Sequence, residues 1–314
     1  MHRREFLSAS LSVGAGALVA SAAPKDKPAM LPVIDTHQHL WDLSKFKLGW
    51  LKKGAELDAS FTPKEYAEAT KGLNVVKAVY MEVDVVPEQQ QDEVDYITEL
   101  CKDKKTPTVA AVVSGRPGTK DFATYVAQFK TNKFIKGIRQ VLHVDATPVG
   151  YCLKKEYVKD VQFLGDLGLS FDLCLRASGI LDGAKLAEKC PDTRFILDHC
   201  GNPQFKFTDK EKESWKADLA TIAKEPNVIC KVSGFVANGW PKGKWKADDV
   251  AWVVNTTIDT FGIDRVMFGG DWPVCTLAGT YADWLTALRT VIASRPEADQ
   301  KKILHDNAAK FYGI

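Results

Sequence analysis

The sequence predicts a (β/α)8 barrel, the α/β TIM-barrel fold in which eight parallel strands alternate with helices around a closed sheet. Short runs rich in β-branched residues recur along the chain, longer amphipathic segments lie between them, and polar residues collect where the runs end. Eight such units in about 280 residues match the usual size of this fold. An open doubly wound sheet is the competing architecture, but no glycine-rich phosphate loop follows any run.

The expected strands begin 25 to 43 residues apart, which is the length of a strand, a helix and two loops. They cover residues 33–39, 76–82, 109–114, 134–140, 169–175, 194–199, 228–233 and 265–271. Helical periodicity is clearest over residues 63–69, 90–101, 215–224, 281–293 and 301–311. We expect a single barrel domain over residues 24–314, because no repeat or low-complexity linker divides the chain.

The composition is that of a globular protein, with 45% hydrophobic and 26% charged residues. The formal net charge is only +2 and the basic residues are scattered. We therefore expect neither a nucleic-acid-binding surface nor a polybasic membrane patch. A neutral or modestly anionic small molecule is the expected ligand, and a homo-oligomer is compatible with the sequence.

The first residues have the layout of a secretory signal peptide. Arg3 and Arg4 precede an apolar run, and the small residues 21–23 follow it. The adjacent arginines resemble a twin-arginine export signal. The apolar run is shorter than the roughly 20 residues that span a bilayer, which argues against a retained membrane anchor. We expect cleavage near Ala22 or Ala23, removal of residues 1–23, and a periplasmic protein without membrane association.

The seven cysteines include no CxxC pair, and their number is odd. These features argue against a zinc knuckle and against a fully paired disulfide framework. Most of the cysteines are expected to be buried thiols. The twin-arginine resemblance implies export of a chain that has already folded in a reducing cytoplasm, so free thiols are compatible with a periplasmic protein.

The first expected strand carries the strongest chemical signal. Alternate side chains of a strand share a face, so Asp35, His37 and His39 are expected to point together into the mouth of the barrel. Two imidazoles on one face can both reach a single divalent ion. The alternative is a pair of histidines that only cap the strand end with hydrogen bonds.

Two further polar residues end expected strands. His199 ends the sixth and Asp271 ends the eighth, at the barrel rim where catalytic residues gather. The eighth strand of a closed barrel adjoins the first, so Asp271 is expected beside His37 and His39. A helix N-cap or turn carboxylate is the alternative for Asp271. We expect Asp271 and His199 to be catalytic.

Weaker candidates for binding the substrate lie at other strand ends. Glu82 ends the second expected strand, and Arg139 lies in the fourth, where its guanidinium suits a carboxylate. Alternatively these two residues pair with each other. The remaining candidates are His143, Arg176 and Trp41. A surface-loop histidine is the alternative for His143, and packing is the alternative for Trp41.

Three of these strand ends resemble motifs of the amidohydrolase superfamily. They are Asp35-Thr36-His37-Gln38-His39-Leu40-Trp41, Leu197-Asp198-His199-Cys200-Gly201-Asn202-Pro203 and Gly270-Asp271-Trp272-Pro273. Within its amidohydrolase-2 branch, the chain is most similar to sugar lactonases of the L-fuconolactonase or L-rhamnonolactonase type and to 2-pyrone-4,6-dicarboxylate lactonase.

The resemblance implies a role for each of the main candidates. His37 and His39 match the first-strand pair, His199 the sixth-strand histidine, and Asp271 the aspartate that activates water. Two-metal members also use a modified lysine that ends strand four and a histidine on strand five. Lys136 lies early in its strand and residues 171–175 contain no histidine. We therefore expect at most one divalent ion, zinc if present, held by His37, His39, His199 and Asp271, and a metal-independent site stays open.

The resemblance also implies hydrolysis of a small lactone, such as an aldonolactone. Asp271 would take the proton of the attacking water and return it to the departing alkoxide. The histidines would hold the ion or donate hydrogen bonds to the carbonyl oxygen. One alternative is a metal-dependent nonoxidative decarboxylase of an aromatic or related acid. Another is a noncatalytic periplasmic sugar-binding protein.

Overall fold

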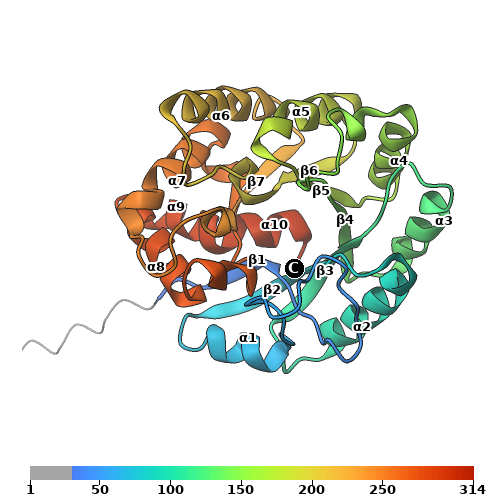
Figure 1. Ribbon diagram of the computed structural model, residues 1–314, viewed down its shortest axis with the longest axis horizontal. Coiled ribbons are helices and arrows are strands. Elements are labelled where there is room, and N and C mark those ends of the chain that lie inside the picture. The colour runs from blue at the N-terminus through green and yellow to red at the C-terminus, as the bar shows by residue number, and fades with distance from the viewer. Residues whose placement is uncertain (1–29) are drawn as a thin grey trace, which may run out of the picture. The chain divides into compact units, whose positions relative to one another are not determined.

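The computed structural model describes residues 30–314, and residues 31–314 form one compact unit. The expected signal segment, residues 1–23, lies outside the described residues. Eight parallel strands follow one another around the sheet in the order β1 to β8, with helices outside them (Figure 1). The expected (β/α)8 barrel is confirmed.

Each strand begins and ends within three residues of its expected bounds. They are β1 (Val33–Gln38), β2 (Val75–Met81), β3 (Thr108–Ser114), β4 (Ile135–Val141), β5 (Ser170–Cys174), β6 (Arg194–Leu197), β7 (Val228–Val232) and β8 (Val266–Phe268). Strands β6 and β8 end before His199 and Asp271. Both residues have a left-handed backbone, with φ of 55° and 54°, which breaks the pleat and turns the chain at the strand end.

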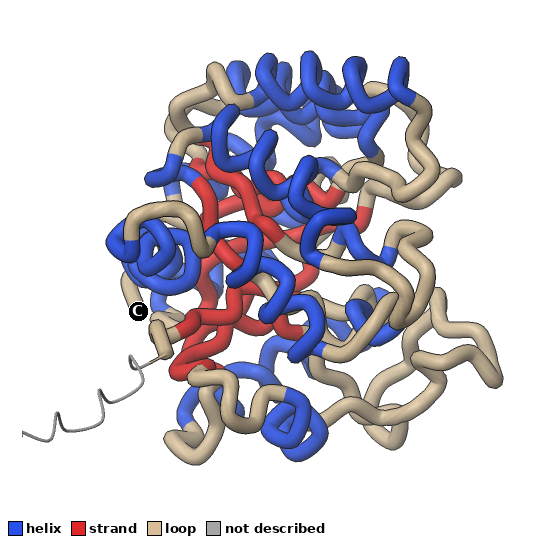
Figure 2. The backbone as a smooth tube through the Cα atoms, turned by 90° about the vertical axis from the view of Figure 1, so that its left-hand side faces the viewer, coloured by secondary structure: helices blue, strands red, loops and turns tan. Residues whose placement is uncertain are grey.

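Helices surround the strands on the outside of the barrel (Figure 2). They are α1 (Pro63–Ala69), α2 (Gln90–Lys102), α3 (Phe122–Ala127), α4 (Lys155–Asp166), α5 (Ile180–Lys189), α6 (Asp209–Ile222), α7 (Ala247–Phe261), α8 (Tyr281–Ile292) and α9 (Glu297–Lys301). Helix α10 (Asn307–Tyr312) instead lies across the ring of strands (Figure 1). Helix α6 begins earlier than expected because Thr208 and Glu211 form a capping box at its start. Among the described residues, no helix is long and apolar enough to cross a membrane.

The barrel closes between its first and last strands. Gln38 and Trp272 form a parallel bridge, and the His39 amide donates to the Trp272 carbonyl over 2.8 Å. The Asp271 amide donates to the His37 carbonyl, also over 2.8 Å. These contacts hold the ends of β1 and β8 together.

Apolar side chains fill the interior of the barrel. They come from several strands and from α10, which lies across the ring of strands in Figure 1: Ile34, Val79, Met81, Ala110, Val112, Ile196, Met267, Ala308 and Tyr312. All seven cysteines are buried and free, as expected for most of them.

The expected direction of Asp35 is wrong. Its carboxylate accepts hydrogen bonds from the hydroxyls of Tyr66 in α1 (2.7 Å) and Tyr281 in α8 (3.1 Å), so it faces the helices. It also accepts from the Gly270 amide over 2.7 Å. The pairing of β1 with β2 shifts between Asp35 and Gln38, and this irregularity breaks the alternation of side chains. Asp35 therefore supports the strand ends from outside the barrel.

Candidate active site

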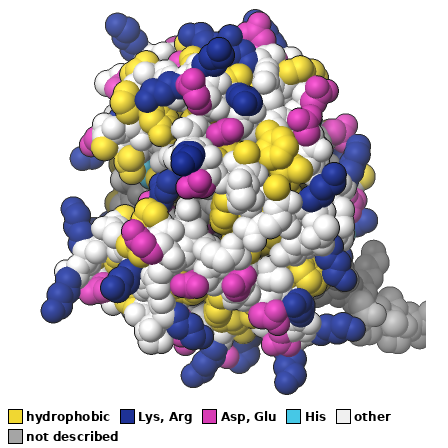
Figure 3. Space-filling model, turned by 90° about the vertical axis from the view of Figure 1, so that its right-hand side faces the viewer, with side chains coloured by type: hydrophobic (Ala, Val, Ile, Leu, Met, Phe, Trp, Pro, Cys, Tyr) yellow, Lys and Arg dark blue, Asp and Glu magenta, His cyan; other side chains and the backbone are white. Residues whose placement is uncertain are grey.

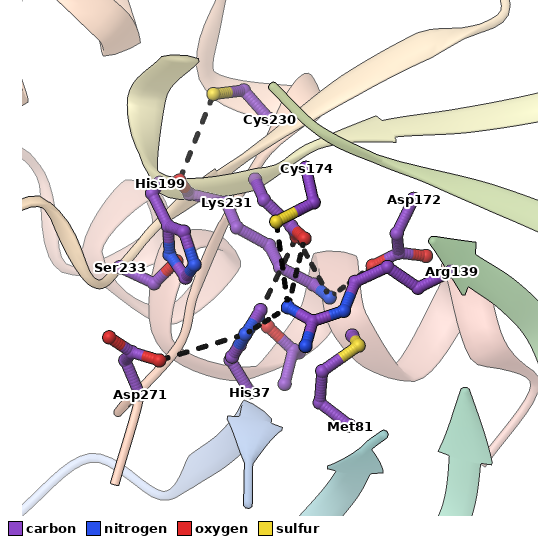
Figure 4. Close-up of polar contacts among 12 residues, drawn as sticks. His37, Met81, Arg139, Asp172, Cys174, His199, Cys230, Lys231, Ser233 and Asp271 are labelled. Atoms are coloured by element: carbon purple, nitrogen blue, oxygen red, sulfur yellow. Dashed lines mark hydrogen bonds and ion pairs between the residues drawn. The ribbon is translucent and has the colours of Figure 1, made fainter. Parts of the chain in front are cut away.

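The four main candidates meet at the carboxyl ends of the strands. The ring centroid of His37 lies 4.9 Å from that of His39 and 4.5 Å from that of His199. Asp271 Oδ1 lies 3.3 Å from His39 Nε2 and 3.7 Å from His37 Nε2. Figure 4 shows His37, His199 and Asp271 converging. The structure thus brings together residues that are far apart in the sequence.

Backbone carbonyls fix the orientation of His39. Its Nδ1 lies 3.0 Å from the carbonyl oxygens of both Met81 and Glu82. A carbonyl oxygen only accepts, so Nδ1 carries a proton. Nε2 then faces Asp271, and a histidine held in this way through Nδ1 has the arrangement of a metal-ligating histidine.

Arg139 and Asp198 fix the orientation of His37. Arg139 Nη1 lies 3.3 Å from His37 Nε2, and a guanidinium only donates, so Nε2 is the acceptor. The proton is then on Nδ1, which lies 3.5 Å from Asp198 Oδ1. Burial lowers the pKa of His37 well below its usual value, against the attraction of Asp198. His37 is therefore a neutral imidazole.

His199 lies in a tight turn against β7. Its Nδ1 contacts the Ser233 hydroxyl at 2.9 Å. A Cβ atom on Gly234, where φ is +58°, would lie 2.1 Å from that nitrogen, so only glycine allows this approach. Burial lowers the pKa of His199, which favours the neutral ring.

The four expected metal ligands do not form one group, and His199 is grouped instead with Asp198, which was not an expected ligand. One group consists of His37, His39 and Asp271, and the other of His37, Asp198 and His199. Within each group the donor atoms lie within 4.8 Å of one another. The first group has the donor set of a catalytic zinc site, which has three protein ligands and an open position. To bind such an ion, His37 Nε2 would exchange its hydrogen bond from Arg139 for the metal. Asp271 and His39 also line a cavity from which a ligand could enter.

In the second group, the negative charge of Asp198 is already paired with two cations. Asp198 Oδ2 lies 3.6 Å from Arg139 Nη1, and its Oδ1 lies 3.4 Å from Lys231 Nζ. Burial alone would raise the pKa of Asp198, but Lys231 and His37 hold it well below its usual value. A second divalent ion there would be repelled by two fixed positive charges. This group does not fit a second metal.

Comparison with known proteins shows the family of the chain. The sequence profile of the amidohydrolase family matches residues 34–314. The chain belongs to the amidohydrolase family. This amidohydrolase is 27% identical, over 290 residues, to an L-fucono-1,5-lactonase of Burkholderia multivorans, with 90% of this chain and 96% of the relative covered. An L-fucono-1,5-lactonase of Burkholderia ambifaria is 26% identical, over 90% of this chain and 95% of its own.

Solved structures share the fold of the amidohydrolase. The crystal structure of an amidohydrolase from Burkholderia multivorans with bound zinc has a TM-score of 0.80 at 23% identity and covers 90% of this chain and 99% of its own. A probable 2-pyrone-4,6-dicarboxylic acid hydrolase from Acinetobacter baumannii, with citric acid bound, has a TM-score of 0.72 at 15% identity, with 90% and 100% covered.

The amidohydrolase also has buried charges that sequence reasoning did not single out. Lys231 Nζ lies 2.6 Å from Asp172 Oδ2, and both side chains are completely buried with Asp198 inside the barrel. The available signal was a charged residue inside an apolar strand, since charged side chains are rarely buried unless they are paired. Asp172 in Phe171-Asp172-Leu173 and Lys231 in Cys230-Lys231-Val232 are such residues.

The substrate-binding candidates have different surroundings. Arg139 Nε lies 2.6 Å from Glu82 Oε1, so these two residues pair with each other, which was the alternative expected for them. Trp41, Arg139, His143 and Arg176 line a cavity of about 680 Å³ together with His39, His199 and Asp271. Glu82 is 1% exposed and is not among the residues that line the cavity, and its carboxylate holds the Arg139 guanidinium in place. The Trp41 indole donates to the Ala59 carbonyl, so it offers the cavity an apolar surface.

Proposed function

We propose that this amidohydrolase hydrolyses a small, uncharged sugar lactone. The charge of the cavity carries the proposal. Four acidic residues and two arginines line it: Asp84, Glu211, Asp218, Asp271, Arg139 and Arg176. Even a bound divalent ion would only bring this formal charge to neutral. A dicarboxylate would find no excess of positive charge there to bind it. A neutral polyol lactone does not depend on such a charge.

Both arginines already have acceptors. Arg139 is paired with Glu82, and its Nη2 donates to the Glu82 carbonyl over 2.9 Å. Arg176 donates to the Thr147 carbonyl over 2.7 Å and lies 3.7 Å from Asp145. A substrate carboxylate would have to compete with these partners. The similarity to proteins named L-fucono-1,5-lactonase supports the same substrate class.

Asp271 is the proposed base. Its carboxylate takes one proton from the attacking water, whose oxygen forms a bond to the lactone carbonyl carbon. When the carbon–oxygen bond of the ring breaks, the departing alkoxide takes the same proton back. The products are the open hydroxy acid and a regenerated carboxylate. Asp271 is 3% exposed and lines the cavity, so it is open to the substrate but shielded from bulk water.

The histidines stabilise the negative charge that develops on the carbonyl oxygen. His199 is held through Nδ1 by Ser233 and can donate to that oxygen from Nε2. His37, His39 and Asp271 would hold a divalent ion, which we propose to be zinc, and a bound ion supplies Lewis-acid polarisation of the carbonyl. Only one Asp271 oxygen is then needed as a ligand, which leaves the other for the proton.

A panel of substrates tests the proposal. We expect release of protons from neutral aldono-1,5-lactones, and much slower release from a pyrone dicarboxylate lactone. Aromatic acids are assayed in parallel for release of carbon dioxide. Carbon dioxide without lactone opening would replace the proposal by the decarboxylase, and saturable sugar binding without turnover would replace it by the binding protein.

A further inference from the structure

We propose that the Cys174 thiol fixes His143 as a neutral hydrogen-bond donor to an uncharged oxygen atom of the substrate. His143 follows β4 and lines the cavity that also contains His199 and Asp271. Its Nδ1 lies 3.0 Å from Sγ of Cys174, the last residue of β5. This inference rests on the proposed function for the nature of the substrate, but not for the state of the imidazole.

The neighbours of the sulfur decide the direction of the hydrogen bond. Arg139 Nη1 lies 3.9 Å from Cys174 Sγ and can only donate, so the sulfur is an acceptor towards the guanidinium. Figure 4 shows the Arg139 guanidinium beside the Cys174 sulfur. The thiol then donates its own proton to His143 Nδ1, the acceptor that lies within hydrogen-bond distance among the described side chains. An imidazole that accepts at Nδ1 carries its proton on Nε2.

If His143 donated to Cys174 instead, fewer polar groups would be paired. If His143 Nδ1 donated, the sulfur would accept from both His143 and Arg139, and the buried thiol proton would lose its acceptor. Buried polar groups are usually paired, which favours donation from the thiol. The free Nε2–H of His143 is then available to a ligand in the cavity.

The charge states of the two groups agree with this assignment. Residue 143 is exposed at the cavity. Partial loss of water around its imidazole still lowers the pKa of His143 to about 4, with His199 and Arg139 acting in the same direction and Asp271 and Asp198 against it. Burial also raises the pKa of Cys174 well above its usual value. The pair is a neutral thiol and a neutral imidazole, in contrast to the ion pair of a nucleophilic cysteine.

Cys174 is a positioning residue. It is completely buried, and it is not among the described residues that line the cavity, so its sulfur has no path to a lactone carbonyl. His143 is the group that would touch the substrate. A neutral donor suits a hydroxyl, carbonyl or ring oxygen, which is the chemistry of a polyhydroxylated lactone.

Nitrogen-15 NMR of the full-length protein tests the state of His143 without any substrate. The two ring nitrogens of a neutral imidazole have distinct shifts, and the spectrum of His143→Gln identifies the signals. We expect the proton on Nε2 in the wild type and in Cys174→Ser, and a mixture of tautomers in Cys174→Ala. A proton on Nδ1 in the wild type would overturn the proposal.

Kinetics test the consequence for the substrate. His143→Gln places an amide donor near the position of Nε2 and should keep most of kcat/KM, whereas the shorter His143→Asn should lower it by up to about tenfold. Cys174→Ala should lower kcat/KM by a similar factor, and Cys174→Ser should restore it. Cys101→Ala, a buried cysteine of α2 outside the cavity, is the matched control and should match the wild type.

The two experiments separate this inference from the proposed function. A wild type that opens no neutral lactone contradicts the proposed function, while the tautomer of His143 still decides the present proposal. A covalent acyl adduct on Cys174, detected by mass spectrometry after rapid quenching, would also overturn it. Equal kcat/KM for the Gln and Asn variants would remove His143 from substrate binding.

Discussion

His39 Nε2 and Asp271 Oδ1 lie 3.3 Å apart, although the two residues come from the ends of the first and last strands. The distance depends on barrel closure, since the backbone bonds between residues 37–39 and 271–272 hold both side chains in place. The catalytic pair therefore forms only when the sheet has closed. This relationship makes Asp271 the most informative residue to change.

We predict that Asp271→Asn abolishes nearly all turnover and leaves substrate affinity largely intact. The amide keeps the shape of the carboxylate but cannot accept the water proton, and loss of a general base typically lowers the rate by about 10²–10⁴-fold. Steady-state kinetics should place the effect in kcat far more than in KM. Turnover within a few-fold of the wild type would exclude Asp271 as the base.

We predict that each chain binds at most one divalent ion. The group of His37, His39 and Asp271 fits an ion, whereas the group with Asp198 lies between Arg139 and Lys231. Elemental analysis of protein purified without chelator should give no more than one equivalent. His39→Gln should lower the metal content, and His305→Gln, whose ring pairs with Asp306, serves as its control. Two ions per chain would contradict the prediction.

We predict that Lys231→Met destabilises the protein by about 3–5 kcal/mol, because it leaves buried carboxylates without their counter-ion. The partners of its ammonium group are Asp172 and Asp198. Urea denaturation measures the loss, and Lys216→Met, on the exposed face of α6, is the matched control. Adding Asp172→Asn should recover part of the stability. A loss below about 1 kcal/mol would mean that the network contributes no more than a surface ion pair.

We predict that Glu93→Gln removes a pH-dependent loss of stability. Glu93 Oε1 accepts from the Tyr80 hydroxyl (2.8 Å) and the Val83 amide (2.9 Å). Burial, and then the charge of Glu82, raises the pKa of Glu93 from 4.5 to about 8. The folded protein thus keeps a proton that the unfolded chain releases above pH 4.5. The contribution of Glu93 to stability is complete below that pH and falls until pH reaches about 8.

Denaturation at several pH values measures this effect. The stability of Glu93→Gln relative to the wild type should rise by roughly a few kcal/mol between pH 5 and pH 8. Glu99→Gln, at an exposed position of the same helix, should show no such trend. A relative stability that is independent of pH would show that Glu93 ionises normally.

We predict that the mature protein begins near Ala23 and is periplasmic. The prediction depends on Arg3, Arg4 and the small residues 21–23. N-terminal sequencing of the protein from a periplasmic fraction tests it. A cytoplasmic protein that retains Met1 would contradict it.

The sequence by itself determined the architecture and the main polar residues of the site. The period of β-branched runs and amphipathic segments predicted eight strands close to their observed bounds, because hydrophobic periodicity reflects which side of an element is buried. The position of His37, His39, His199 and Asp271 at strand ends predicted their meeting, because all strands of a parallel barrel have their carboxyl ends on one rim.

The tertiary structure alone decided which way the side chains point and which charges they meet. Asp35 faces the helices because the pairing of β1 with β2 shifts beside it, and such a shift depends on the neighbouring strand. Asp172 and Lys231 lie in β5 and β7, Asp198 directly follows β6, and only folding brings them into one buried network next to His37. Electrostatic interactions depend on distance and burial, and a linear sequence specifies neither of these.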